Sequence, residues 1–187
     1  MTPKFVFGYG SLVNRRSHAA PQAHPARLRG WQREWCQTSL RPTPFLSVRP
    51  SADHEVLGLI AEVAQEDWQA LDEREAAYER HQVAVDDHGL DPSPHTQVYA
   101  ICPDLKATTA DGPILLSYLD VVVQGYLHVF GEDGAKAFFD TTAGWDRPVL
   151  NDRSAPRYSR HQVLAPEEIA LVDNGLKALS VPVKKLE

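Results

Sequence analysis

The sequence has few of the features that mark secreted, metal-binding or membrane-bound proteins. It contains two cysteines in 187 residues, Cys36 and Cys102, without the close spacing of a zinc or redox motif. No apolar run approaches the roughly 20 residues that a membrane-spanning helix needs. These absences favour a protein of the reduced cytoplasm, with no disulfide framework, no metal knuckle and no membrane partner.

Basic residues are also in the minority. The 19 Lys and Arg residues stand against 25 Asp and Glu residues, which gives a formal net charge of −6. Because a nucleic-acid-binding surface needs clustered Lys and Arg facing phosphates, we expect no nucleic-acid partner. The hydrophobic content of 43% suffices for one substantial core, so we expect residues 1–187 to form a single domain, as a monomer or a homodimer.

A glycine-containing loop follows the first apolar segment. The β-prone run Lys4–Phe7 is cut off by Gly8-Tyr9-Gly10-Ser11, which lacks the third glycine of a dinucleotide fingerprint and the Gly-Lys-Ser/Thr ending of a phosphate-binding loop. Tyr9 and Val13 stand where a nucleophile elbow around Ser11 would carry glycine. Two readings stay open: a plain tight turn, or a concavity whose backbone N–H groups hold a carboxylate or an oxyanion.

Strand and helix signals alternate along the rest of the chain. Strands are expected at Val56–Val63, His81–Val85 and Gln97–Cys102, with short strands and irregular turns over Gln22–Pro50. Helices are expected at Gln65–Ala77, Ile114–Phe130, Glu132–Thr141 and Pro166–Leu179. The polar run 86–94 predicts a surface loop, and 144–160 predicts an irregular excursion long enough for a lid.

One carboxylate interrupts the apolar face of the helix expected at 65–77. Positions 68, 71, 75 and 78 line that face, and Glu75 is the odd member. The other three positions are Trp68, Leu71 and Tyr78. A carboxylate in this setting loses hydration, which raises its pKa towards the range of general acid–base catalysis. The alternative is a helix that ends before Glu75, or an ion pair of Glu75 with Arg74 or Arg80 at the rim.

Several segments, taken in order, resemble one known family. The run Val6-Phe7-Gly8-Tyr9-Gly10-Ser11-Leu12 resembles the amino-terminal signature of the γ-glutamylcyclotransferase superfamily, particularly its ChaC-like branch. Leu71-Asp72-Glu73-Arg74-Glu75 resembles the family's Leu-Asp-x-x-Glu segment, whose last residue is the catalytic acid–base residue. Gly30-Trp31-Gln32-Arg33 resembles its Gly-Trp-x-Arg segment, and Ser117-Tyr118 resembles the start of a helix with a substrate-facing Tyr.

The resemblance implies a fold, a reaction and a site. The fold would be α+β, a small mixed, partly closed β-barrel with surrounding helices. The reaction would be the intramolecular cyclisation of a γ-glutamyl amide, which releases 5-oxoproline and an amine without a cofactor or a metal. Glu75 would be the general acid and base. The substrate-binding residues would be Val6, Phe7, Gly8, Tyr9, Gly10, Ser11, Leu12 and Tyr118.

One segment departs from the family pattern. Leu40-Arg41-Pro42-Thr43-Pro44 stands where ChaC proteins that act on glutathione carry Asp-His-Arg-Gly-Thr, which argues against glutathione as the substrate. We expect the departing half of the substrate to meet variable surface, at 86–95 or at 144–160. The identity of the departing amine stays open.

Three other functions compete with this hypothesis. A binding module would keep the fold and the γ-glutamyl pocket without turnover, since fold does not guarantee function. A metal hydrolase would use His81, His88 and His95, although their spacing matches no recognised ligand set. A cysteine enzyme would use Cys36, whose neighbours are more typical of an ordinary strand thiol.

Overall fold

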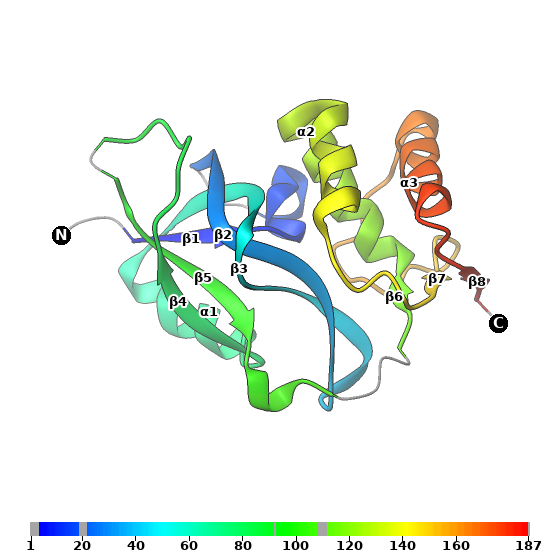
Figure 1. Cartoon of the computed structure of the whole chain (residues 1–187), viewed down its shortest axis with the longest axis horizontal. Helices are drawn as coiled ribbons and strands as arrows, with labels where there is room; N and C mark the ends of the chain where they lie inside the picture. Colours follow the sequence, from blue (N-terminus) through cyan, green and yellow to red (C-terminus); the bar gives the residue numbers. More distant parts are fainter. Residues whose placement is uncertain (1–3, 19–21, 92, 108–111, 187) are drawn as a thin grey trace.

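A curled five-stranded sheet forms the larger part of the fold (Figure 1). The computed structural model describes residues 4–18, 22–91, 93–107 and 112–186, so Pro92 of the predicted loop lies outside the described residues. The strands are β1 (Lys4–Gly8), β2 (Ala23–Thr38), β3 (Arg41–Val63), β4 (Tyr78–Val83) and β5 (His95–Ile101). Their spatial order is β2-β3-β1-β5-β4, which places β1 at the centre, antiparallel to β3 and parallel to β5.

The central strand β1 delivers the glycine loop. Phe5, Val6 and Phe7 are all buried, because β1 has neighbours on both edges and packing on both faces. The chain leaves the sheet at Gly8 and continues into two short 3-10 turns, Ser11–Val13 and Arg15–Ser17. The loop at 8–11 is therefore held at the end of the most buried strand of the sheet.

The segment 22–50 differs from its prediction, because it forms long strands in place of short ones. β2 and β3 make one extended hairpin, paired from Ala23 with Ala61 to Thr38 with Arg41. β1 pairs with β3 only from Leu59 onwards, so the earlier part of β3 has one neighbour. Proline lacks an N–H and is tolerated in a strand where the ladder is one-sided, which explains how this hairpin accepts its prolines. They are Pro25, Pro42, Pro44 and Pro50.

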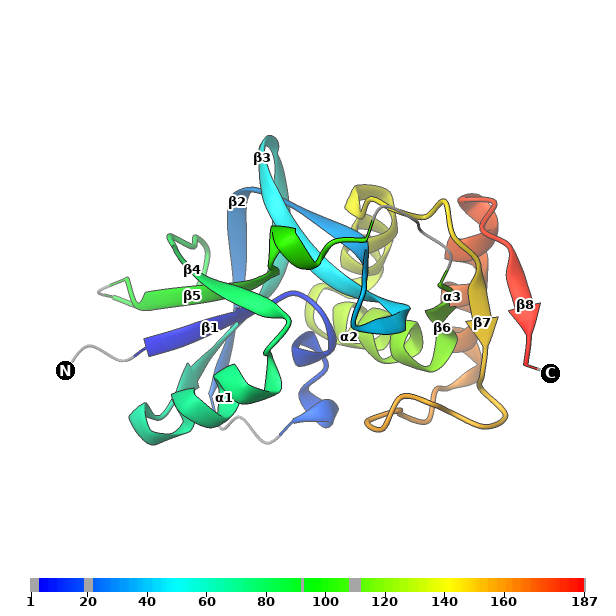
Figure 2. The ribbon, with the colours of Figure 1, turned by 90° about the horizontal axis from the view of Figure 1, so that it is seen from below.

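Within the described ranges, three α-helices accompany the sheet. They are α1 (Trp68–Arg74), α2 (Leu116–Thr141) and α3 (Pro166–Ala178). The helix α1 lies beside β4, whereas α2 and α3 lie together at the other end of the molecule (Figures 1 and 2). Gly131 interrupts α2 with φ 72° and ψ −171°, values that glycine tolerates and other residues rarely adopt, so the two helices predicted here are confirmed as two pieces.

A small parallel sheet completes the fold beside α2 and α3 (Figure 2). Its strands are β6 (Ile114–Leu115), β7 (Val149–Asn151) and β8 (Val183–Lys185), in the order β6-β7-β8. Strands this short carry no clear sequence signal. The predicted α+β class is confirmed, with the five-stranded sheet curled into a half-barrel. No helix among the described residues has the length and apolarity needed to cross a membrane.

The helix after Gln65 is shorter than predicted. A 3-10 turn occupies Gln65–Asp67, and the α-helix proper ends at Arg74. Glu75 adopts φ −97° and ψ 31°, and its N–H still donates to the Leu71 carbonyl, so it caps the helix without belonging to it. The helix stops here because the chain turns to pair as β4, beginning with Tyr78 opposite Ile101. The alternative reading, in which the helix ends before Glu75, is confirmed.

Arg33 joins the sheet to α2 from within the core. Its side chain is 2% exposed, and its guanidinium donates to the Thr142 hydroxyl at 3.1 Å, to the Thr141 hydroxyl at 3.1 Å and to the hydroxyl of Tyr126. The Tyr126 hydroxyl donates in turn to the Leu57 carbonyl at 2.6 Å. Burial lowers the pKa of Arg33, and the tyrosine oxygen partly offsets that effect. The arginine of the family-like Gly-Trp-x-Arg segment is therefore a structural residue.

Candidate active site

Two adjoining cavities lie where the glycine loop, α1, the β2-β3 hairpin and the start of α2 meet. The wider has a volume of about 350 Å³ and the narrower about 120 Å³. Residues 6–12, which are the end of β1 and the glycine loop, line the narrower cavity, and the hairpin segment 41–46 lines much of the wider one. Residues that border both cavities mark their junction. They are Ser11, Leu46, Arg74, Glu75, Tyr78, Tyr118 and Arg160.

The narrower cavity gathers every residue that the sequence predicted for the site. Val6 to Leu12 line it in an unbroken run, together with Glu75 and Tyr118. Residues far apart in the chain thus meet at one place because β1, α1 and α2 all end or begin there. Their roles in binding and catalysis stay predictions.

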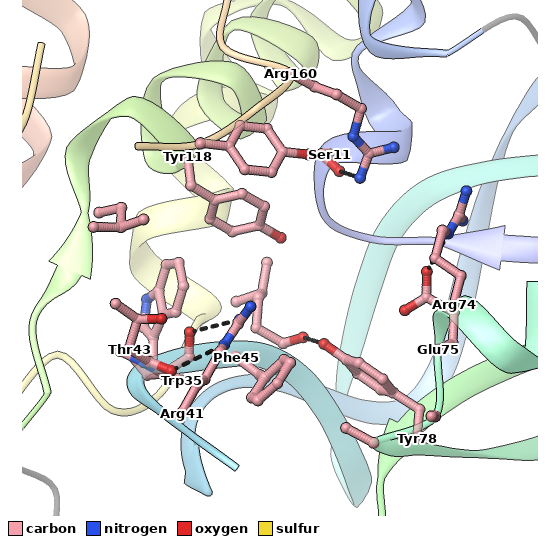
Figure 3. Close-up of a pocket in the computed structure, with 16 residues that line it drawn as sticks. Ser11, Trp35, Arg41, Thr43, Phe45, Arg74, Glu75, Tyr78, Tyr118 and Arg160 are labelled. Atoms are coloured by element: carbon pink, nitrogen blue, oxygen red, sulfur yellow. Dashed lines mark hydrogen bonds and ion pairs between the residues drawn. The ribbon is translucent and has the colours of Figure 1, made fainter. Parts of the chain in front are cut away.

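Glu75 lines both cavities and so lies at their junction. Figure 3 shows it beside Arg74 at the wall of the wider cavity. Its side chain is 26% exposed, so it is less buried than the apolar stripe predicted. One carboxylate oxygen accepts from Arg74 Nε at 3.0 Å, the ion pair that the alternative reading named. The helix end places the carboxylate at the cavity wall, within reach of water and of a substrate.

The loop and Tyr118 approach each other closely. A Cβ built at Gly10 would lie 2.6 Å from the Tyr118 hydroxyl oxygen, so no larger residue fits there without displacing the tyrosine. The Ser11 backbone also acts on the Tyr118 hydroxyl, where it partly offsets the rise in pKa that burial causes. Gly10 is therefore required by tertiary contact with the start of α2, which lies over a hundred residues later in the chain.

Tyrosines make up much of the junction, and they keep their protons at neutral pH. Burial, reinforced by the charges of Tyr158 and Glu75, raises the pKa of Tyr118. Burial likewise raises the pKa of Tyr78, whose hydroxyl donates to the Leu46 carbonyl at 3.1 Å. The Tyr118 hydroxyl is thus a neutral group that borders the same two cavities as the Glu75 carboxylate, able to donate a hydrogen bond to an oxyanion.

The segment 144–160, predicted as an irregular excursion, contributes part of the cavity wall. Tyr158 and Arg160 line the wider cavity. The Tyr158 ring packs edge-on against Tyr118 with centroids 5.0 Å apart, and Arg160 Nη2 lies 3.5 Å from the Ser11 hydroxyl (Figure 3). By contrast, no described residue of 86–95 lines either cavity. Of the two loops expected to meet the departing group, one reaches the site.

The sequence reasoning missed most of the wider cavity. Its lining includes residues with no motif around them: Trp35, Arg41, Thr43, Pro44 and Phe45. The hairpin β2-β3 folds these positions back towards α2, which is a matter of register and not of local pattern. One signal was available, because residues 41–44 belong to the segment that departs from the family pattern.

The other chemistries considered find little support in this geometry. The His81 ring packs against Trp31 at 5.7 Å, and His88 Nδ1 accepts from the Leu90 N–H at 3.0 Å. Within the described ranges, no group of three or more His, Cys, Asp or Glu side chains could hold a metal ion. Cys36 lines neither cavity, and burial raises the pKa of its thiol, opposite to what an activated nucleophile requires.

The sequence matches one family model, and the fold resembles several solved structures. A family model described as "Gamma-glutamyl cyclotransferase, AIG2-like" matches residues 6–117. A solved "Gamma-glutamyl cyclotransferase" covers 92% of this chain and 99% of its own at 14% identity, with a TM-score of 0.58. The structure of an uncharacterized protein from Homo sapiens also covers 92% of this chain and 99% of its own, at 15% identity and with a TM-score of 0.59.

A third solved structure, YkqA from Bacillus subtilis, has a TM-score of 0.58 and 15% identity, over 77% of this chain and 57% of its own. No curated protein matches the sequence. At these identities the structural likeness shows the fold alone. None of these three structures singles out the ChaC-like branch.

Proposed function

Because the chain belongs to the gamma-glutamyl cyclotransferase, AIG2-like family, we propose that it is a γ-glutamylcyclotransferase that works without a cofactor. Its substrate is a γ-glutamyl amide, and its products are 5-oxoproline and an amine. The observation that carries the proposal is the position of Glu75, at the junction of the two cavities and opposite the glycine loop. The family membership confirms the predicted superfamily, while the branch stays a prediction.

The reaction makes few demands on the protein beyond positioning and proton transfer. The α-nitrogen of the γ-glutamyl group attacks its own γ-carbonyl carbon, a five-membered lactam closes, and the bond to the departing nitrogen breaks. Two protons leave the α-ammonium, and two are gained by the departing nitrogen, which leaves as an ammonium. Because the nucleophile belongs to the substrate, holding the γ-glutamyl group of the substrate in a folded conformation supplies much of the rate enhancement.

Glu75 is the group that moves these protons. A carboxylate at the cavity wall takes the two protons from the α-nitrogen one after the other and gives each to the departing nitrogen, which is a poor leaving group until it is protonated. Its ion pair with Arg74 keeps the carboxylate oriented between the two cavities. One residue thus serves both steps in turn.

Each of the two cavities holds one half of the substrate. The γ-glutamyl group occupies the narrower cavity along residues 6–12, and the departing amine occupies the wider one. Backbone N–H groups between Tyr9 and Leu12, together with the Tyr118 hydroxyl, donate to the oxygens of the γ-glutamyl group. The scissile amide then lies at the junction, beside Glu75.

The test measures 5-oxoproline release from a panel of γ-glutamyl amino acids, γ-glutamyl amines and glutathione. Glu75→Gln keeps the size of the side chain and removes the proton acceptor. Since general acid–base catalysis contributes on the order of 10²–10⁴-fold, we expect the rate to fall by that factor.

A matched control is Glu73→Gln. Glu73 is exposed on α1, two residues before Glu75, and lines neither cavity, so this variant should keep the wild-type rate. Equal rates in wild type and Glu75→Gln would remove Glu75 from the mechanism. Binding of γ-glutamyl compounds without 5-oxoproline release across the panel would instead favour the non-catalytic binding module.

A further inference from the structure

The wider cavity carries more positive than negative charge. Among the described residues, three guanidinium groups border it, those of Arg41, Arg74 and Arg160, against the single carboxylate of Glu75. Arg74 pairs with Glu75, whereas neither Arg41 nor Arg160 forms an ion pair with a described residue. This surplus runs against the net charge of −6 of the whole chain. The cavity is therefore suited to a ligand that brings negative charge.

In the part of the chain that the structure describes, Arg41 is the cation that lines the wider cavity alone. It does not line the narrower cavity, whereas Arg74 and Arg160 border both. Its Nε donates to the Thr43 carbonyl at 3.1 Å, its Nη2 donates to the Pro44 carbonyl at 3.2 Å, and its guanidinium carbon lies 3.4 Å from the centre of the Phe45 ring. These contacts fix the guanidinium plane and leave Nη1 without a partner among the described residues.

The position of Arg41 decides which half of the substrate it meets. Figure 3 shows Arg74 and Glu75 on one side of the cavity and Arg41 with Thr43 on the other, with Tyr118 projecting between them. The junction therefore separates a γ-glutamyl group in the narrower cavity from Arg41. The guanidinium therefore faces the departing amine.

The remaining walls are aromatic, and one of them holds an unsatisfied donor. Trp35, Phe45 and Tyr158 line the wider cavity and not the narrower one. Trp35 is 3% exposed, and its indole N–H has no hydrogen-bond partner in the described part of the chain. That N–H has no exposed surface, so Trp35, Phe45 and Tyr158 offer a ligand the apolar surface of their rings.

We propose that the wider cavity selects a departing amine that carries both an anionic group and a large apolar group, and that Arg41 is the residue that recognises the anionic group. The apolar group packs among Trp35, Phe45 and Tyr158. The inference rests on the proposed function, because it assigns the half of the substrate that the reaction releases.

The test compares two substrates that differ in one carboxylate. They are γ-glutamyl-phenylalanine and γ-glutamyl-phenethylamide, which share the reacting group and the aromatic ring. Hydrogen bonds to charged groups are among the stronger ones in proteins, so we expect wild type to prefer the carboxylate by on the order of 10–100-fold in kcat/KM, chiefly through KM. In Arg41→Gln this preference should fall to about 3-fold or less, and Arg41→Lys should retain part of it.

Arg49→Gln is the matched control. Arg49 lies on the same strand, is exposed, pairs with Glu34 and lines neither cavity, so this variant should keep the wild-type preference. Equal turnover of both substrates by wild type, or an unchanged preference in Arg41→Gln, would overturn the proposal while the proposed function stands.

A binding measurement separates the two claims. Calorimetry with Glu75→Gln should show tighter binding of the carboxylate-bearing compound, and the double variant Glu75→Gln, Arg41→Gln should lose that difference. If wild type turned over neither substrate but this binding pattern held, the proposed function would fail and the assignment of Arg41 would survive. Equal binding of the two compounds would refute the assignment.

Discussion

Ser117 and Asp152 are joined by two buried hydrogen bonds. The Ser117 N–H donates to one carboxylate oxygen at 2.8 Å, and the Ser117 hydroxyl donates to the other at 2.6 Å. Asp152 also accepts from the Arg157 N–H at 2.9 Å, and the Ser117 oxygen accepts from the Tyr158 N–H at 3.2 Å. The first turn of α2 is thereby tied to the segment that carries Tyr158 and Arg160.

We expect Asp152→Asn to loosen this junction. The amide group replaces one acceptor oxygen with a donor, which then faces the donors that the carboxylate satisfied. An unsatisfied buried polar group costs about 1–3 kcal/mol, so the free energy of unfolding in urea should fall by that amount. Asp146→Asn is the control, because Asp146 lies on the same segment with its side chain 74% exposed. An equal fall in the free energy of unfolding of the two variants would show that the buried hydrogen bonds contribute no more to stability than an exposed carboxylate does.

The contact between Gly10 and Tyr118 predicts a specific rescue. Gly10→Ala should lower kcat/KM on the order of 100-fold, because the new methyl group displaces the tyrosine hydroxyl and misplacements of about 1 Å are costly. In a Tyr118→Phe background the nearest atom to the methyl group is Leu46 Cδ2 at 3.5 Å, an ordinary contact.

Gly10→Ala should then cost little beyond Tyr118→Phe alone. The measurement is a double-mutant cycle on 5-oxoproline release. If Gly10→Ala cost the same in both backgrounds, the tyrosine hydroxyl would not be the obstacle.

Arg33 should be irreplaceable by lysine. Its planar guanidinium reaches the two threonine hydroxyls and Tyr126 at once, and a single ammonium cannot reproduce that fork. We expect Arg33→Lys to lower the free energy of unfolding by about 2–3 kcal/mol. Arg49→Lys, at an exposed position, should leave it within about 0.5 kcal/mol. Comparable stability of the two variants would mean that the buried network does not hold the sheet to α2.

Tyr9 predicts a dependence of stability on alkaline pH. Burial first, then the charges of Tyr78, Tyr118 and Glu75, raise the pKa of Tyr9 above its ordinary value of 10.0. The folded state then holds the proton more tightly than the unfolded state. The stabilisation is complete at neutral pH and is lost as pH rises above about 10.

Tyr9→Phe isolates this effect, because it removes the titrating hydroxyl and its bond to the Tyr99 carbonyl at 2.6 Å. At neutral pH the variant should be less stable than wild type by about 1 kcal/mol. That deficit should shrink above about pH 10, because Tyr9 then ionises in the unfolded wild type while it keeps its proton in the folded state, which favours unfolding of wild type alone. Urea denaturation across this range measures it, and a deficit independent of pH would contradict the prediction.

The sequence carried enough local information for much of the fold. The apolar run before Gly8, the strands that include 56–63 and 97–101, and the two helical pieces around Gly131 are set by side-chain periodicity and by glycine, which act over a few residues. The end of α1 was predicted too late in the chain. The pairing of Tyr78 with Ile101, which ends the helix, joins residues far apart in the sequence, so a helical pattern cannot predict it. The long β2-β3 hairpin was missed for the same reason.

The candidate site shows the same difference between what local sequence predicts and what long-range contacts decide. The sequence by itself singled out the glycine loop and Glu75 from short runs of residues, and it singled out Tyr118 through the resemblance to a known family. Only the tertiary structure decided that Glu75 caps its helix beside Arg74, and that Arg41 and Arg160 reach the wider cavity from segments 119 residues apart. The physical reason is that cavity walls are made by the register of strands and by buried ties such as Ser117 with Asp152. These interactions join distant residues, and no local pattern records them.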